Sequence, residues 1–182
     1  MAIRKVARMG NPVLRKKNRE LTEAEIKSPA IQELIKDMVE TMHEYAGVGL
    51  AAPQIHESLK LAVIQVKSDN KRYAGEEGSD LLVIINPKIK ILDQKKLGFW
   101  EGCLSVPGLR GFVERPRKIK VSYLNEKAEA KDIIVDDFLA IVFQHELDHL
   151  EGILYIDKLT DSKKLVFNDE FDKFYTDEES VD

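Results

Sequence analysis

The sequence has few of the features that mark a secreted, membrane-spanning or nucleic-acid-binding protein. It contains one cysteine, Cys103, so no disulfide can form within the chain. No run approaches the roughly 18 apolar residues of a membrane span, and the opening MAIRKVARMGNPVL lacks the apolar core of a signal peptide. The net charge of -4 provides no basic excess for nucleic acid. We therefore expect a cytoplasmic protein with no nucleic-acid or membrane binding.

The composition is that of an ordinary soluble globular protein. Hydrophobic residues make up 43% of the chain and charged residues 33%, a balance that allows a sizeable core. No internal repeat or low-complexity linker interrupts the sequence, and 182 residues suit one compact domain. We expect a single domain over residues 1–182, with an acidic tail that is partly frayed from about residue 160.

Two segments have the apolar periodicity of helices. Within residues 28–47, Ser28 suits the N-cap position, and apolar residues then recur at three- and four-residue spacing, which predicts an amphipathic helix ended by Gly47. Residues 135–150 are apolar around much of the helix circumference. This second helix should therefore be buried, and Gly152 is placed to end it.

Other segments have the patterns of strands and loops. Strands are predicted where β-branched or alternating apolar residues gather, at 59–66, 81–87, 88–94 and 118–125. Residues 47–54 and 68–80 are predicted loops, and the Gly- and Pro-rich stretch 98–116 is predicted to be irregular. Strands and helices do not alternate regularly. This favours an α+β fold, with antiparallel or mixed β-sheets around a central buried helix and an N-terminal amphipathic helix.

The central helix carries the sequence HELDH, with His145 and His149 four residues apart. Residues at this spacing lie on one face of a helix, so both histidines can bind one metal ion. Glu146 lies about 100° around the helix from His145, where its carboxylate can move a proton on water without binding the ion. The alternative is two buried, hydrogen-bonded histidines, because so short a pattern also arises by chance. Because the helix is predicted to be buried, we favour the interpretation that the two histidines bind a metal ion.

A catalytic zinc or iron site usually has a third protein ligand. A metallopeptidase pattern would continue to a histidine at position 155, where this chain has Tyr155. The remaining histidines, His43 and His56, have no neighbours that suggest a metal site. The remaining soft ligand is Cys103, which could alternatively be a small buried hydrophobic residue.

The sequence around Cys103 favours the interpretation of this residue as a metal ligand. Gly102 allows a close approach of the backbone, and Glu101 can pair with Arg115 to fix the loop. A Cys-His-His set with water in the fourth position is a coherent open catalytic site for zinc or ferrous iron.

Three stretches together resemble the signature motifs of bacterial peptide deformylases: GVGLAAPQ (47–54), EGCLSVP (101–107) and QHELDHLEG (144–152). The likeness includes the opening ARMGNPVLRKKNREL and reaches about residue 159. It departs only outside the motifs, in the loop 68–80 and the short acidic tail. The resemblance implies removal of the N-formyl group from N-formylmethionine of newly made polypeptides, with release of formate. It further implies attack by metal-bound hydroxide, with Glu146 as general acid and base.

The resemblance also assigns the metal and the groups that stabilise the oxyanion. Cys103, His145 and His149 would bind one divalent ion, Fe²⁺ in the cell, which Zn²⁺, Ni²⁺ or Co²⁺ can replace. The oxyanion would accept hydrogen bonds from the side-chain amide of Gln54 and the backbone N–H of Leu104. Without the other motifs, Gln54 would be interpreted as a loop residue that forms local hydrogen bonds.

The methionine side chain needs an apolar pocket, for which the candidates are Val48, Leu104, Ile141 and Val142. Gly47 and Gly49 would leave backbone free to pair with an extended peptide, although a simple turn also explains them. Arg110 is a candidate contact for the peptide backbone, with a surface charge as the alternative. The implied partners are nascent formylated polypeptides and, from the substrate class alone, the ribosome near the exit tunnel.

Three other functions remain as alternatives. A metallopeptidase could use the same helix, but Tyr155 stands where its third histidine would be. A structural metal site would normally have four protein ligands, and we find three. An inactive relative used for binding would not need Glu146, which is present.

Overall fold

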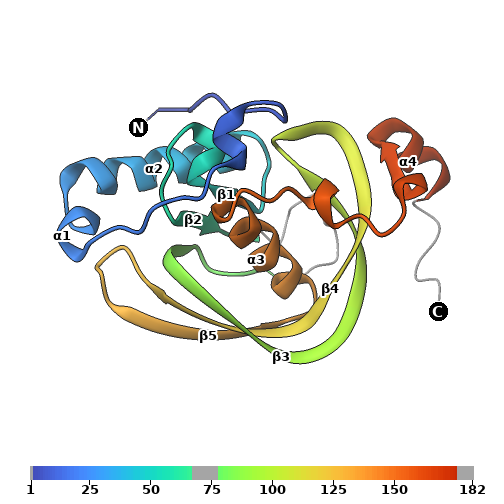
Figure 1. Ribbon diagram of the computed structural model, residues 1–182. Coiled ribbons are helices and arrows are strands. Elements are labelled where there is room, and N and C mark those ends of the chain that lie inside the picture. The colour runs from blue at the N-terminus through green and yellow to red at the C-terminus, as the bar shows by residue number, and fades with distance from the viewer. Residues whose placement is uncertain (1, 67–77, 176–182) are drawn as a thin grey trace.

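The computed structural model describes residues 2–66 and 78–175. In chain order the helices are α1 (Glu23–Ile26), α2 (Pro29–Glu44), α3 (Asp137–Leu150) and α4 (Asn168–Phe174). The strands are β1 (Gly49–Ala51), β2 (Leu61–Ile64), β3 (Leu82–Cys103), β4 (Val106–Leu124), β5 (Ala130–Asp136) and β6 (Leu165–Phe167). Short 3₁₀ helices are η1 (Pro12–Arg15), η2 (Ala52–Ile55), η4 (Tyr155–Lys158) and η5 (Ser162–Lys164). The α+β class predicted from the sequence is confirmed (Figure 1).

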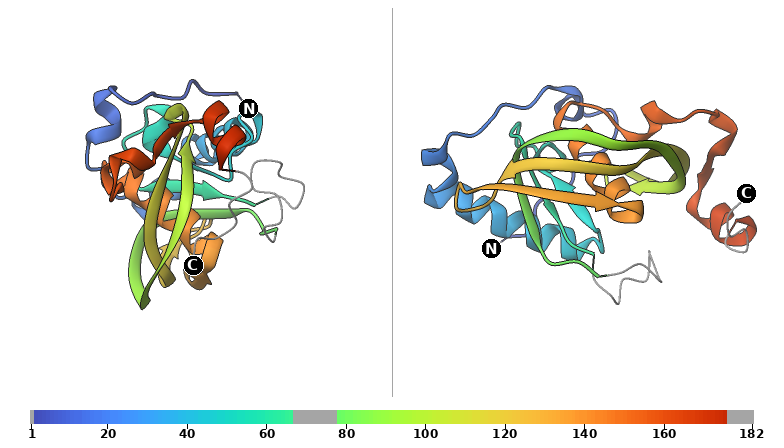
Figure 2. Two further views of the ribbon diagram at one scale, coloured as in Figure 1. Left: turned by 90° about the vertical axis from the view of Figure 1, so that its right-hand side faces the viewer. Right: turned by 90° about the horizontal axis from the view of Figure 1, so that it is seen from below.

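The strands form one antiparallel sheet in the order β1-β2-β3-β4-β5, and β6 pairs with β4. The long β3 and β4 make a hairpin that runs from Ile85 opposite Leu124 to Cys103 opposite Val106. The hairpin's register shifts at several points, which bends and twists it. The long strands curve past α3, and the C-terminal segment lies beyond one end of the hairpin (Figures 1 and 2). The closed end of the hairpin, with Cys103, meets α3 at His149.

Helix α2 begins as predicted, with the Ser28 side chain accepting a hydrogen bond from the backbone N–H of Ile31 (3.4 Å). Its apolar face packs against β1, β2 and β3 in one hydrophobic cluster. The helix ends at Glu44, three residues before the predicted Gly47, because Ala46 already has a positive φ of 51°. The predicted amphipathic helix is confirmed, and the following turn delivers the chain to β1.

Helix α3 is the buried helix that the sequence predicted. Its apolar side chains, among them Phe143 and Leu147, pack in a second cluster with residues of β2, β3, β4 and β5. Beyond its end, Gly152 has a φ of 75° and its N–H donates to the carbonyl of His149 (3.2 Å). Among the described residues, no helix combines the length and the apolar character that crossing a membrane requires.

Two predicted irregular segments are partly strands. Within 47–54, residues 49–51 form β1, because its backbone pairs with Ala62–Ile64 of β2, and residues 52–55 form η2. The stretch 98–116, predicted to be irregular, continues both arms of the β3–β4 hairpin. Most of the predicted loop 68–80 lies outside the described residues, and residues 78–80 have no regular structure.

The sequence analysis expected a tail that is partly frayed from about residue 160, and the described part of this tail, up to residue 175, contains regular structure. The segment forms η5, β6 and α4. It is held because β6 pairs with Leu109–Gly111 of β4 and because Phe171 and Tyr175 pack against Trp100, with ring centroids 5.3 and 5.0 Å away. The C-terminal segment is thus attached to the same end of the hairpin that carries Cys103.

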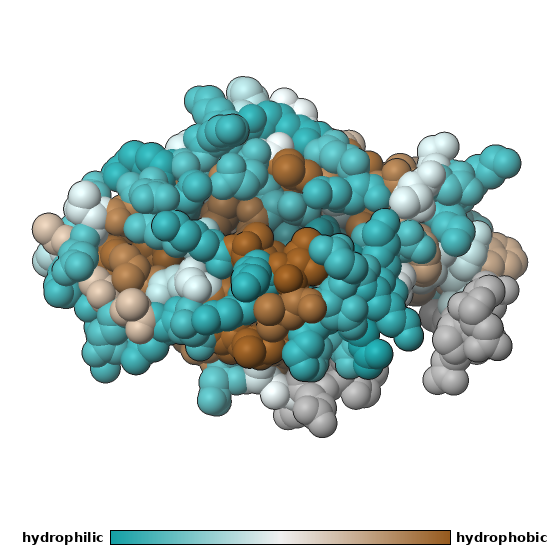
Figure 3. Space-filling model, turned by 60° about the horizontal axis from the view of Figure 1, so that its bottom comes forward, coloured by the Kyte–Doolittle hydropathy of each residue, from teal (hydrophilic) through white to brown (hydrophobic). Residues whose placement is uncertain are grey.

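The surface is largely hydrophilic, with apolar side chains grouped on the underside of the molecule (Figure 3). Strands β3 and β5, which pass along the underside in Figure 1, carry exposed apolar residues. The largest are Ile89, Ile91, Leu92 and Ile134.

Candidate metal centre

Cys103, His145 and His149 come together at the closed end of the hairpin. Their ligand atoms all lie within 4.8 Å of one another, and Cys103 Sγ is 3.2 Å from His149 Nε2. Zinc bonds of about 2.0 Å to nitrogen and 2.3 Å to sulfur place tetrahedral ligand atoms roughly 3.5 Å apart. A thiolate with two imidazoles is also a donor set that suits zinc and ferrous iron. The three side chains therefore fit one such ion.

A buried network orients His145. Its Nδ1 is 2.7 Å from Glu101 Oε2, and Arg115 donates to both Glu101 oxygens at 2.5 and 3.0 Å. Arg115 also donates to Asp148 at 2.7 Å. Burial alone would raise the pKa of Glu101, but the hydrogen bonds from His145 and Arg115 lower it to about 2. A carboxylate on Nδ1 leaves Nε2 free for a metal ion. The predicted Glu101–Arg115 pair is confirmed, and its role in holding His145 was not predicted.

Cys103 is surrounded by groups that favour its thiolate form. Burial alone would raise its pKa, but the charges of His149 and His145 lower it well below the usual value. The Ser105 backbone N–H also donates to Sγ at 3.4 Å, as does the Gln54 side-chain amide at 3.6 Å. The thiolate is the form of cysteine that binds metals.

Glu146 lies beside these residues with its carboxylate buried (4% of the residue is exposed). No described residue donates a hydrogen bond to its Oε2, and burial raises its pKa. Its side chain reaches Gly49 of β1, where a Cβ would stand 2.5 Å from Oε1. A buried carboxylate with a free oxygen and a raised pKa is suited to carry a proton at neutral pH.

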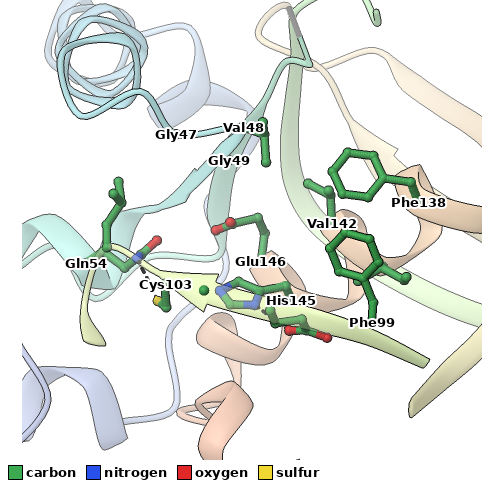
Figure 4. Close-up of a pocket in the computed structure, with 14 residues that line it drawn as sticks. Gly47, Val48, Gly49, Gln54, Phe99, Cys103, Phe138, Val142, His145 and Glu146 are labelled. Atoms are coloured by element: carbon green, nitrogen blue, oxygen red, sulfur yellow. Dashed lines mark hydrogen bonds and ion pairs between the residues drawn. The ribbon is translucent and has the colours of Figure 1, made fainter. Parts of the chain in front are cut away.

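Gln54, in η2, is held in one orientation. Its Oε1 accepts from the backbone N–H of Ala51 (2.8 Å), while Nε2 donates to Ser105 Oγ (3.2 Å). The amide nitrogen consequently faces Cys103. In Figure 4 the side chains of Gln54, Cys103, Glu146 and His145 gather at one end of the pocket. Ser105 was missed in the sequence, because a serine two residues after a ligand has no distinctive pattern.

An apolar pocket opens beside this polar end, with Phe99, Phe138 and Val142 at the other side of Figure 4. All predicted pocket and peptide-binding residues except Arg110 line it. These are Gly47, Val48, Gly49, Leu104, Ile141 and Val142. The sequence analysis missed Phe99 and Phe138. Phe138 precedes Ile141 by three residues on the same helix face, and Phe99 alternates with Glu101 and Cys103 along β3, so both signals were available.

Two further residues lie away from the pocket. Arg110 is not among its lining residues, and its guanidinium instead lies 4.8 Å from the centre of the Phe171 ring. Tyr155, at the position of a metallopeptidase's third histidine, is buried and stacks on His145 with ring centroids 6.0 Å apart. A tyrosine ring in this place packs against a ligand and supplies no imidazole.

Comparison with known proteins gives one consistent result. The model of the polypeptide deformylase family matches residues 3–165. The chain is 46% identical over 172 residues to a peptide deformylase of Leptospira biflexa, covering 94% of this chain and 96% of that protein. It is 45% identical over 159 residues to one of Caldanaerobacter subterraneus, covering 87% and 91%.

Solved structures agree with these sequence relatives. A ligand-bound class I type b peptide deformylase from Acinetobacter baumannii superposes with a TM-score of 0.84 at 34% identity, covering 88% of this chain and 100% of that one. A peptide deformylase from Thermotoga maritima superposes with a TM-score of 0.78 at 35% identity, with the same coverage.

Proposed function

Because the chain belongs to the polypeptide deformylase family, whose members are metal-dependent hydrolases, we propose that it removes the N-formyl group from N-formylmethionine of newly made polypeptides and releases formate. The observation that carries this proposal is the convergence of Cys103, His145 and His149 beside the buried Glu146 and an apolar pocket. Together these supply a metal site, a proton carrier and a space for the methionine side chain.

Cys103, His145 and His149 would hold one divalent ion, which we propose to be Fe²⁺ in the cell, with Zn²⁺, Ni²⁺ or Co²⁺ able to replace it. When bound, such an ion supplies a Lewis acid that lowers the pKa of water and polarises a carbonyl oxygen. The Glu101 carboxylate on Nδ1 of His145 supports this role by keeping the other ring nitrogen directed at the ion.

Glu146 takes the proton of the attacking water and later gives it to the amine nitrogen that leaves. Its free Oε2 and its burial-raised pKa support both steps, since the group must be deprotonated in one and protonated in the next. It does not have to be a metal ligand for this, because the Cys-His-His set already leaves the fourth position for water.

Gln54 and Leu104 stabilise the negative charge that develops on the formyl oxygen. The Gln54 amide nitrogen faces Cys103 and is fixed through its contacts with Ala51 and Ser105. A donor that is already oriented needs little reorganisation during the reaction. The backbone N–H of Leu104, next to Cys103, would be the second donor.

The apolar pocket takes the methionine side chain, with Val48, Ile141 and Val142 on its walls beside Phe99 and Phe138. The backbone of residues 47–49 would pair with the extended peptide. The formyl carbon is bonded to the carbonyl oxygen, the amide nitrogen and one hydrogen. It is therefore little crowded and can come close to Glu146.

We further propose that the substrates are nascent formylated polypeptides in the cytoplasm, met near the ribosomal exit tunnel, and that residues 1–182 act as one domain. These statements follow from the substrate class that the family implies.

The proposal is tested by incubating metal-loaded protein with formyl-Met-Ala-Ser, acetyl-Met-Ala-Ser and the unblocked peptide, and by measuring formate and free amine. We expect formate from the formyl peptide only, loss of activity after chelation, and recovery when a divalent ion is restored. Absence of formate from the formyl peptide at full metal occupancy would refute the proposed function. Release of acetate at a similar rate would instead indicate a general amidase.

A further inference from the structure

A second, wider groove adjoins the metal centre. It has a volume of about 800 Å³ and shares Cys103 and Leu104 with the apolar pocket. Its other walls come from N-terminal residues 5–8, from residues 106–109 at the start of β4, and from Asn168 at the start of α4, together with Asn11, Tyr45 and His56. Space beside the reacting end of a substrate therefore continues into a groove wide enough for several more residues of a polypeptide.

The charged side chains that line this groove are all cationic. Lys5 and Arg8 are exposed in it, and among the described residues no carboxylate lines it, although the chain has 32 acidic residues and a net charge of -4. Within the described ranges, neither Lys5 nor Arg8 forms an ion pair. In the part of the chain that the structure describes, the groove thus presents two positive charges without an acidic partner, and a ligand with carboxylates would complement them.

The two cations are held in a fixed relation to the site. Between them, Val6 and Ala7 are buried, and the Ala7 N–H donates to the carbonyl of Gln54 (2.7 Å). One residue beyond Arg8, the Met9 N–H donates to the carbonyl of Ser105 (2.7 Å). Gln54 and Ser105 both donate a hydrogen bond to Cys103 Sγ. The backbone that carries Lys5 and Arg8 is therefore anchored directly to the metal centre.

Asn168, another lining residue, carries a hydrogen-bond acceptor. Asn168 Oδ1 is buried and accepts no hydrogen bond from the residues that the structure describes. Buried polar atoms usually have a partner, and a backbone N–H of a bound peptide would provide one here.

We propose that this groove binds the residues that follow formylmethionine in the substrate, and that it favours carboxylate side chains there through Lys5 and Arg8. The inference rests on the proposed function, because the groove is assigned by its continuity with the formyl site. Exposed ion pairs are individually weak, so two of them predict a preference of about 3- to 10-fold for acidic over basic residues. The preference should shrink with added salt, because the charges are exposed to solvent.

The test compares formyl-Met-Ala-Ser extended by three Glu, three Gln or three Lys residues, which reach roughly 10 Å further in an extended chain. We expect kcat/KM in the order Glu, Gln, Lys at low salt and near-equality at 0.5 M KCl. Binding of the corresponding peptides without the formyl group, labelled at the C-terminus and measured by fluorescence anisotropy, should follow the same order. Equal values for the three peptides in both measurements would overturn the inference.

Charge reversal supplies the matched variants. The double variant Lys5→Glu/Arg8→Glu should reverse the Glu-to-Lys ratio, whereas Lys88→Glu/Lys90→Glu, with the same change of net charge on exposed β3 positions outside the groove, should leave the ratio as it is. Lys5→Gln/Arg8→Gln, which only removes the charges, should abolish the preference. A ratio that responds equally to both reversed pairs would reflect net charge and refute the groove. If no peptide releases formate, the proposed function fails, and the anisotropy order still decides whether the groove prefers acidic chains.

Discussion

Replacement of Gly49 by alanine tests whether the position of the Glu146 carboxylate controls catalysis. The added Cβ would stand 2.5 Å from Glu146 Oε1 and 2.7 Å from both Cδ and Cγ. Nonbonded heavy atoms settle at about 3.5 to 4.0 Å, so the carboxylate has to retreat by about 1 Å. Gly49 lies in β1, paired with Ile64, so the strand cannot easily give way in its place.

A displacement of about 1 Å in a catalytic group can cost about 100-fold in rate. We therefore expect kcat/KM of Gly49→Ala on formyl-Met-Ala-Ser to fall about 100-fold. The overlap should also cost about 1–3 kcal/mol of stability, as overpacking of a filled interior usually does. The metal content should be unchanged, because the three atoms nearest the new methyl group all belong to Glu146, which is not a proposed ligand.

The assay is formate release at measured metal occupancy, together with urea unfolding. Gly98→Ala is the control for overlap as such, since its Cβ would overlap the Phe112 ring outside the pocket. It should lower stability with less than a tenfold change in kcat/KM. If Gly49→Ala keeps activity within threefold of the wild type at equal metal content, the carboxylate does not need its present position and our reasoning is wrong.

Three further predictions concern the ligand, the proton carrier and the C-terminal segment. Cys103→Ala should weaken metal binding, as measured by chelator competition. The loss should exceed the roughly 10- to 100-fold that follows removal of a residue that only hydrogen-bonds to a ligand. Wild-type affinity would exclude Cys103 as a ligand. Glu146→Gln should retain the metal and lose at least about 100-fold in kcat, and a metal-free variant would contradict its role as a non-ligand. Phe171→Ala removes ring contacts with Trp100 and Tyr175, and should lower the free energy of unfolding by about 1–3 kcal/mol. An unchanged urea midpoint would show that the C-terminal segment adds nothing to the hairpin.

The helices could be predicted from the sequence because their signals are local. Ser28 caps α2 and Gly152 follows α3 as the pattern indicated. The error at the end of α2 is small and has a local cause, since Ala46, one residue before the predicted end at Gly47, already has a positive φ. A non-glycine residue in that conformation is uncommon, so no composition rule would have placed the end there.

The β3–β4 hairpin was only partly predicted, because glycine and proline in 98–116 indicated irregular chain. In the structure, glycine and proline are compatible with strands at these positions for specific reasons. Gly98 and Gly111 lie where a Cβ would overlap Phe112 or Tyr155, so they permit close packing within a strand. Pro116 lies at a register shift, two residues before β5 pairing begins at Lys118, so its missing N–H interrupts no regular ladder there. These reasons depend on partners far along the chain, which composition does not reveal.

More of the candidate site than of the β3–β4 hairpin could be predicted from the sequence. The spacing of His145, Glu146 and His149 depends only on helix geometry. Cys103 was reached through the scarcity of other ligands and a resemblance of motifs. The contact of Glu101 with His145 could not be obtained in this way, because it depends on how the end of β3 meets α3. The contact of Ser105 with Gln54 depends in turn on how η2 meets the closed end of the hairpin.

The ion-pair network explains how a strand end and a helix come to form one centre. Arg115 on β4 donates to Glu101 on β3 and to Asp148 on α3, and Glu101 in turn meets His145 on α3. Asp148 follows His145 by three residues, so both contacts use one face of the helix. A rotation of α3 would break the hydrogen bond from Arg115 to Asp148 and the one between Glu101 and His145. Hydrogen bonds to charged groups contribute about 1.5–3 kcal/mol each. The network therefore fixes the rotation of α3 against the hairpin, and this rotation is what brings the two histidines to Cys103.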